Sequence, residues 1–170
     1  MQPTDIIESG EIKLLGLSFY GDPFAASAEW TEENEIGRLW SRFHRYLGKQ
    51  PGLSAHANRW IELHIEHSET HAKGIYEVFV GIEVATFSAI PVDWVAKLLP
   101  ASTYTKFTLQ GQQIISDWYL DVYQIWLPKS GYRIAHKYSM LTYDSRFLGM
   151  DKLDESEVDI YLPICMGTGE

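Results

Sequence analysis

The sequence contains one cysteine, and its 14 lysine and arginine residues are outnumbered by 23 aspartate and glutamate residues. Cys165 alone cannot form an internal disulfide, and no cysteine or histidine spacing is typical of a metal site. We therefore expect neither a metal nor a cofactor. A net charge of −9 repels phosphate backbones, and no stretch concentrates basic residues, so direct nucleic-acid binding is not expected.

Long apolar runs are also missing. No run approaches the roughly 18 residues of a membrane-spanning helix. The segment Met1–Ile12 lacks the basic flank and apolar stretch of a signal peptide. We therefore expect a cytoplasmic protein without membrane contact. The chain also has no Gly-x-Ser-x-Gly turn and no phosphate-binding glycine loop, which disfavours serine-hydrolase and nucleotide chemistry.

The 170 residues suffice for one domain, 1–170, and 45% of them are hydrophobic, as in a folded globule. Aromatic residues make up 14% of the chain. Most of these rings are expected to fill the core, and some of them to line a ligand pocket.

The first half of the chain has the order strand, helix, strand, strand. Ile12–Tyr20 is predicted to be a buried strand, and Trp60–Glu66 and Ile75–Ala85 alternate as half-buried strands. A helix is expected from an N-cap at Thr31 to Gly48. Its apolar face is formed by Ile36, Leu39, Trp40, Phe43 and Leu47. In the strand 60–66, the acidic and histidine side chains are expected to point away from the apolar side.

The second half repeats this order after a connection over 86–100 that is predicted to be irregular. Tyr104–Gln110 is predicted to be a strand, Gln112–Leu127 a helix, and Lys137–Tyr143 and Glu157–Ile164 two further strands. The half-repeats thus span roughly 12–85 and 104–164. The predicted fold is α+β: tandem β-α-β-β units forming a twisted, mainly antiparallel sheet, with helices on one face and a cleft between the halves.

Several segments together resemble a known family. They are Val80–Val84 (VGIEV), Pro100–Phe107 followed by Gly111, Ile125–Tyr132 (IWLPKSGY), Glu157–Ile164 (EVDIYLPI) and the helix motif Leu39-Trp40-x-x-Phe43. This combination resembles the GyrI-like, or AraC-type, effector-binding domain over almost the whole chain. Within that family, the chain resembles the stand-alone members, some of which occur on mobile gene cassettes.

The resemblance implies two β-α-β-β units that bind bulky hydrophobic, aromatic or cationic compounds, as in transcription regulators and multidrug-binding proteins. Where the family often has Phe-Glu-x-Tyr, this chain has Met140-Leu141-Thr142-Tyr143. The glutamate that meets a cationic ligand in several relatives therefore falls on Leu141. A carboxylate for that role must come from elsewhere in the chain.

Glu83 is the first candidate for that carboxylate, because it lies in a mostly apolar strand where an unpaired charge is costly. Two interpretations stay open. Glu83 could face a pocket, or it could share a solvated outward face with Glu77. The aromatic and apolar candidates for the ligand site are Tyr161, Tyr143, Trp40, Trp118, Leu141, Tyr104, Trp126, Trp60 and Phe79.

The leading hypothesis is a small-molecule-binding protein, with a hydrophobic or cationic organic ligand as its partner. One alternative is a hydrolase of the same fold that uses Glu83 or Glu157 as a general acid or base. Another is an interaction module that docks onto a separate regulator. Homodimer formation is also open.

Overall fold

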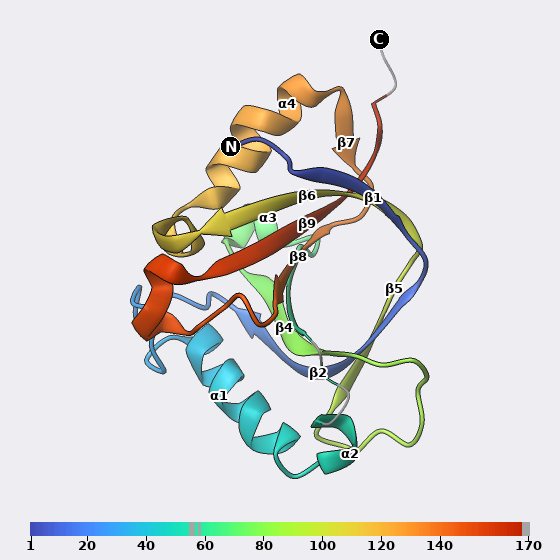
Figure 1. Ribbon diagram of the computed structural model, residues 1–170, viewed down its shortest axis with the longest axis vertical. Helices are drawn as coiled ribbons and strands as arrows, with labels where there is room; N and C mark the ends of the chain where they lie inside the picture. The colour runs from blue at the N-terminus through green and yellow to red at the C-terminus, as the bar shows by residue number, and fades with distance from the viewer. Residues whose placement is uncertain (55–56, 58, 168–170) are drawn as a thin grey trace. The chain divides into compact units, whose positions relative to one another are not determined.

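The computed structural model describes residues 1–54, 57 and 59–167, and the chain divides into two compact units (Figure 1). Unit 2 is Ile12–Leu99, and unit 1 combines Met1–Glu11 with Pro100–Glu170. Each unit places helices against one face of antiparallel strands, which confirms the predicted α+β class. Among the described residues, no helix is both long and apolar enough to cross a bilayer.

Unit 2 contains four antiparallel strands in the order β3-β4-β2-β5. The strands are β2 (Ile12–Gly21), β3 (Trp60–Ile65), β4 (Tyr76–Glu83) and β5 (Val95–Leu99). The helices are α1 (Glu35–Leu47), α2 (Pro51–Ser54) and α3 (Thr70–Lys73). The prediction that 86–100 is irregular is wrong, because β5 lies within it. This short edge strand lacks a clean alternation of apolar residues, so its sequence did not reveal it.

Helix α1 begins later than the predicted cap at Thr31. Its N-cap is Asn34, whose side-chain oxygen accepts a 2.8 Å hydrogen bond from the Gly37 backbone N–H. The backbone carbonyl of Thr31 instead lies close to Gly37. A Cβ added to Gly37 would lie 2.0 Å from the Thr31 carbonyl oxygen. The preceding loop is therefore held against the first turn of α1.

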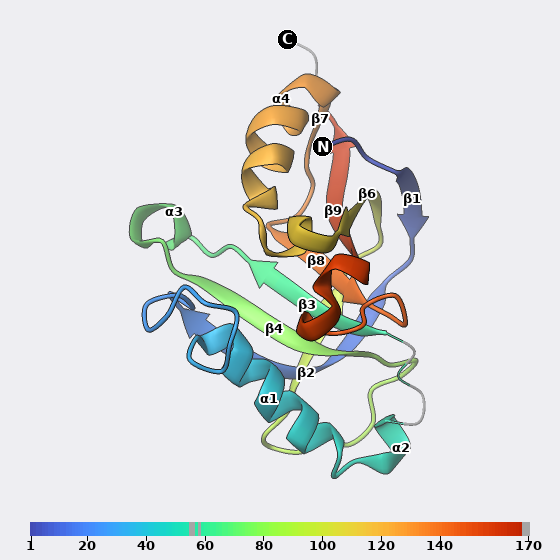
Figure 2. The same ribbon diagram turned by 60° about the vertical axis from the view of Figure 1, so that its left-hand side comes forward.

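The core of unit 2 lies between α1 and the sheet, and Figure 2 shows α1 running along β2 and β4. One face of α1 is buried through Ile36, Leu39, Phe43 and Leu47. It packs on Leu15, Leu17, Val78, Val80, Ile82 and Trp94. This face agrees with the predicted three- and four-residue spacing.

Unit 1 contains strands in the order β1-β6-β9-β8, and β7 also pairs with β9. The strands are β1 (Asp5–Ser9), β6 (Ser102–Gln110), β7 (Tyr132–Ile134), β8 (Tyr138–Tyr143) and β9 (Glu157–Met166). The helical segments are η1 (Gly111–Ile115), η2 (Leu120–Trp126), α4 (Leu127–Ser130) and η3 (Met150–Glu155).

The predicted helix Gln112–Leu127 is wrong in its bounds and type. The structure has a short 3-10 turn, η1, and then a π-helical segment, η2, that continues into α4. In η2 the Leu127 N–H bonds to the carbonyl of Val122, five residues back, and Pro128 contributes no N–H at all. Because a π-helix has wider turns, the 3.6-residue period does not describe this face. The helix ends at Gly131, which has a left-handed conformation (φ 77°).

The two units repeat one arrangement of strands. By pairing order, β3 corresponds to β8, β4 to β9, and β2 to β6. Leu17 on β2 and Phe107 on β6 each lie four residues before a glycine of positive φ, Gly21 and Gly111. The corresponding rows of register partners are Leu17, Val80 and Glu62 in unit 2, and Phe107, Ile160 and Leu141 in unit 1.

Strands β2 and β4 approach each other closely where Gly16 and Gly81 are register partners. A Cβ on Gly16 would lie 2.0 Å from the Val80 carbonyl oxygen, and the fully buried Phe79 ring occupies the remaining space. Backbone atoms cannot move aside as a flexible side chain can. The two glycines are therefore required by this contact and by the ring that covers it.

We expect the substitution Gly16→Ala to lower the free energy of unfolding by about 1–3 kcal/mol, because the added methyl overpacks the strand pair. Gly10→Ala is the matched control, since a Cβ at Gly10 meets nothing within 4 Å. Urea denaturation followed by tryptophan fluorescence measures both. Equal stability of the two variants would contradict this account of the close approach.

Candidate functional site

Helix α1 presents Trp40 beside its buried apolar face, and the indole reaches strand β3. The Trp40 Nε1–H donates a 2.5 Å hydrogen bond to Glu62 Oε2. Glu62 is the register partner of Val80, a core residue beneath α1, so Glu62 lies on the helix-covered face of the sheet. Its exposed fraction is 1%.

Glu62 and His64 thus lie on the face opposite Ile61 and Leu63, as the alternation predicts, but the expectation that β3 is buried on one face only is wrong. In β3 both faces are occupied: Ile61 and Leu63 are fully buried on the face opposite α1. The polar members of the alternation consequently lie on the helix side. His64 Nε2 is 2.7 Å from Glu62 Oε1, so both oxygens of this carboxylate are hydrogen-bonded.

Three rings form a series next to this carboxylate. Trp40 and His44 are stacked with centroids 5.7 Å apart, and His44 meets Trp60 edge-on at 4.8 Å. Trp60 is 36% exposed, so the series extends from a buried hydrogen bond to the protein surface. Trp40, His44, Trp60, Glu62 and His64 are together called the Glu62 cluster.

The charge of Glu62 is felt at a neighbouring phenol. Burial raises the pKa of Tyr76, and the negative charges of Glu62 and Asp22 raise it further. The Tyr76 ring also lies 5.5 Å from the ring of His64. In the described part of the chain, no lysine or arginine forms an ion pair with Glu62; its partners are an indole and an imidazole.

The opposite face of unit 2 holds a carboxylate of a different kind, Glu77. Lys97 Nζ lies 2.6 Å from its Oε1, Ser18 donates to it at 2.5 Å, and His67 Nε2 lies 2.9 Å from Oε2. Burial raises the pKa of Glu77, but the hydrogen bonds from Lys97, Ser18 and His67 outweigh burial and hold it below its usual value. The charge of Glu77 is therefore balanced within the unit.

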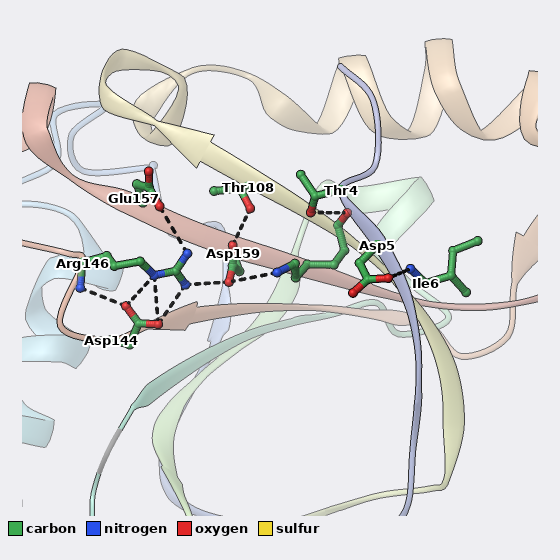
Figure 3. Close-up of polar contacts among 9 residues, drawn as sticks. Thr4, Asp5, Ile6, Thr108, Asp144, Arg146, Glu157 and Asp159 are labelled. Atoms are coloured by element: carbon green, nitrogen blue, oxygen red, sulfur yellow. Dashed lines mark hydrogen bonds and ion pairs between the residues drawn. The ribbon is translucent and has the colours of Figure 1, made fainter.

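Unit 1 balances its buried carboxylate in the same way (Figure 3). Asp159 on β9, with a side chain 5% exposed, lies 2.6 Å from Arg146 Nη2 and accepts a 2.7 Å hydrogen bond from Thr108. Arg146 also pairs with Asp144 at 2.8 Å and Glu157 at 3.2 Å, and Lys106 approaches Asp159 at 3.9 Å. Hydrogen bonds to Asp144 and Asp159 raise the pKa of Arg146.

Two of the predicted site tyrosines come together in unit 1. The rings of Tyr104 and Tyr161 meet edge-on at 6.4 Å, and the Tyr104 hydroxyl is 2.6 Å from the Tyr138 hydroxyl. Burial raises the pKa of both Tyr104 and Tyr138, so both hydroxyls stay protonated at neutral pH. They form a buried, uncharged hydrogen-bonded pair.

Four other predicted site residues lie in or against the helix-side core of unit 1. Leu141 and Trp118 belong to this core, with exposed fractions of 3% and 7%. Trp126 packs its ring edge-on against Phe107 at 5.0 Å, and Tyr143 packs against the same core.

The remaining predicted residues are in unit 2. Trp40 and Trp60 join the Glu62 cluster, whereas Phe79 is fully buried on the face opposite α1. Glu83 lies at the exposed end of β4 and pairs with Arg59 at 2.6 Å. Sequence reasoning missed Glu62, because the alternation in WIELHIE is that of a strand with one solvated face. Among the described residues, no group of three or more His, Cys, Asp or Glu side chains is arranged to hold a metal ion.

Comparison with protein families gives a match to Cass2, described as integron-associated effector binding protein, over residues 5–164. No curated protein matches the chain in sequence.

Solved structures with the same fold include SAV2435 bound to tetraphenylphosphonium, with a TM-score of 0.68, 14% identity, and coverage of 97% of this chain and 94% of that chain. The integron cassette protein VCH_CASS2 from the mobile metagenome of Vibrio cholerae has a TM-score of 0.64 and 16% identity, and the match covers 96% of this chain and 97% of VCH_CASS2. EcmrR in a complex with DNA has a TM-score of 0.69 and 15% identity, covering 96% of this chain and 57% of EcmrR. Identities this low establish similarity of fold.

We expect Arg146→Met to destabilise the protein by about 1–3 kcal/mol, because it leaves the carboxylate of Asp159 buried with only the distant Lys106 as a cation. The guanidinium is 38% exposed, so water screens part of its interaction with Asp159 and the loss stays within this range. Arg38→Met is the matched control: Arg38 pairs with Glu35 at 3.0 Å but is 58% exposed, and its loss should change stability by less than about 0.5 kcal/mol. Chemical denaturation measures the free energy of unfolding of both variants. Equal losses of stability would contradict the role of Arg146 in balancing the charge of Asp159.

The lowered pKa of Glu77 makes a pH-dependent contribution to stability. Its ionised form favours folding, so the contribution is complete above the usual glutamate pKa of about 4.3 and is lost as the pH falls through the lowered value. We expect Glu77→Gln to be less stable than the wild type at neutral pH and to lose less stability between about pH 5 and pH 3. Urea midpoints measured across this range test the slope. Parallel curves for both proteins would show that Glu77 does not contribute.

Proposed function

The chain belongs to the Cass2 family of integron-associated effector-binding proteins, and we propose that it binds bulky, aromatic small organic molecules, including cations, in unit 2. The observation that carries this proposal is the series of rings Trp40, His44 and Trp60, which runs from the surface to a buried carboxylate. Ligand sites combine apolar and aromatic walls with a few polar groups that fix orientation.

The physical chemistry of the Glu62 cluster matches such ligands. Flat rings offer stacking surface, and a cation over a tryptophan face gains about 0.5–2 kcal/mol. Several such contacts add up to affinities in the micromolar range without close shape complementarity. The tetraphenylphosphonium bound to SAV2435, a protein of the same fold, is an aromatic cation of this kind.

The hydrolase alternative gains no support from the arrangement of its candidate residues. Glu83 is ion-paired with Arg59, and Glu157 with Arg146. A general acid or base must be free to contact the substrate, and each of these carboxylates instead contacts an arginine. Direct contact with nucleic acid is disfavoured by the net charge of −9.

We expect tetraphenylphosphonium and the neutral dye Nile red to quench the tryptophan fluorescence, with dissociation constants on the order of micromolar. Trp60→Leu should weaken both by about tenfold, because it removes the exposed ring of the cluster. Trp30→Leu is the control: Trp30 is similarly exposed, at 37%, but contacts Phe24 in another part of unit 2. Absence of binding by both compounds below about 1 mM would refute the proposed function.

A further inference from the structure

We propose that the outer side of helix α1 binds a short acidic segment of a protein partner. Four exposed basic residues lie there: Arg38, Arg42 and Arg45 in the helix, and Lys49 just after its C-cap. They are together called the basic face of α1. This inference is independent of the ligand proposed for the Glu62 cluster, because it concerns the side of α1 that is turned away from the sheet.

The helix gathers these four residues, although the sequence contains no continuous basic run. Their successive spacings are four, three and four residues, which place side chains on one side of a helix. The opposite side of α1 is the buried one, formed by Ile36, Leu39, Phe43 and Leu47. Figure 2 shows α1 lying along β2 and β4, so the basic face is directed away from these strands.

Three of the four cations have no acidic partner. Arg38 pairs with Glu35 at 3.0 Å. Within the described ranges, no carboxylate forms an ion pair with Arg42, Arg45 or Lys49. The positions three and four residues away from them hold no acidic residue, so like charges are neighbours, which is unfavourable in a helix. The helix dipole favours cations near the C-terminus, but it does not explain why a chain with 23 acidic residues leaves them unpaired.

Tyr46 holds two of these cations in place. Its ring centroid lies 5.2 Å from the guanidinium carbon of Arg42 and 5.7 Å from Lys49 Nζ. The Tyr46 hydroxyl accepts a 3.3 Å hydrogen bond from Arg42 Nη2, and the residue packs against the core of unit 2. Side chains that are already ordered lose less conformational entropy on binding, and a guanidinium matches the geometry of a carboxylate. The basic face is therefore preorganised to bind carboxylates.

The charge around the basic face limits what it can bind. With its four residues set aside, 10 basic residues stand against 23 acidic ones in the rest of the chain. Glu32, Glu33 and Glu35 border the basic face at the start of α1. The face is roughly 16 Å long, which corresponds to about five residues of extended chain. Nucleic acids and anionic bilayers carry charge well beyond this length and would meet the glutamates. A short acidic protein segment fits the length that is available.

The experiment uses triglutamate, hexaglutamate and dodecaglutamate as probes, titrated into the isotope-labelled full chain at about 50 mM salt and followed by amide NMR shifts. Hexaglutamate should shift the signals of residues 38–49 with a dissociation constant of about 1 mM or lower, as expected for a few exposed ion pairs. Triglutamate should bind about threefold more weakly, and dodecaglutamate should gain less than about twofold, because its further carboxylates meet the glutamates. No binding of hexaglutamate at about 10 mM would overturn the proposal.

Two double variants assign the binding to its residues. Arg42→Gln combined with Arg45→Gln should weaken hexaglutamate binding by about tenfold. Lys129→Gln combined with Arg133→Gln is the matched control, because it changes the net charge by the same amount at two exposed residues of unit 1. The control should leave the affinity unchanged. Equal weakening in the two double variants would show a response to net charge alone and would overturn the assignment to α1.

Other occupants of the basic face give different results. Oligothymidylate of about 12 nucleotides and phosphatidylglycerol vesicles should bind more weakly than hexaglutamate. Tighter binding of either one, lost with Arg42→Gln and Arg45→Gln, would overturn the choice of a protein partner. Sedimentation at about 100 µM should show no dimer that this double variant abolishes, since such a dimer would assign the face to a second copy. Binding of Nile red is measured separately, so failure here leaves the proposed function standing.

Discussion

The hydrogen bond between the Trp40 indole and the Glu62 carboxylate connects helix α1 to strand β3. Because Glu62 is buried, this bond cannot be exchanged for one to water without a large cost, so it fixes the indole in one orientation. The orientation of Trp40 then sets the stack with His44, and His44 sets the edge contact with Trp60. One buried polar contact thereby positions a series of rings that reaches the surface.

Most of the fold could be predicted from hydrophobic periodicity. The strands β2, β3, β4, β6, β8 and β9 and the helix α1 lie close to where the apolar spacing indicates. The strands that were missed, β1, β5 and β7, are short or lie at sheet edges, where half-exposed side chains give little signal. The helix after β6 was misplaced because η2 is π-helical, and its wider turns bring different residues onto one face.

The candidate site was harder to predict, for a reason that lies in β3. An alternation of apolar and polar residues normally means that one face is buried and the other solvated. In β3 the apolar residues Ile61 and Leu63 are buried on one face, and the polar Glu62 is buried on the other. Single-sequence patterns do not distinguish a solvated carboxylate from one beneath a helix. The family resemblance implied that a carboxylate for a cationic ligand would have to come from a position other than 141, and the candidate chosen from the sequence, Glu83, lies exposed beside Arg59.

The repeat of the two units shows that packing does not require a charge where Glu62 stands. The corresponding position in unit 1 is occupied by Leu141, which is part of the apolar core and makes the same kind of row with Ile160 and Phe107. A leucine therefore satisfies the strand arrangement at this place, and replacing a buried ion by an apolar residue is often neutral or stabilising. Folding alone would favour the apolar choice in unit 2 as well. Glu62 is therefore a buried carboxylate that the strand arrangement does not require, and its partners in the described chain are the indole of Trp40 and the imidazole of His64.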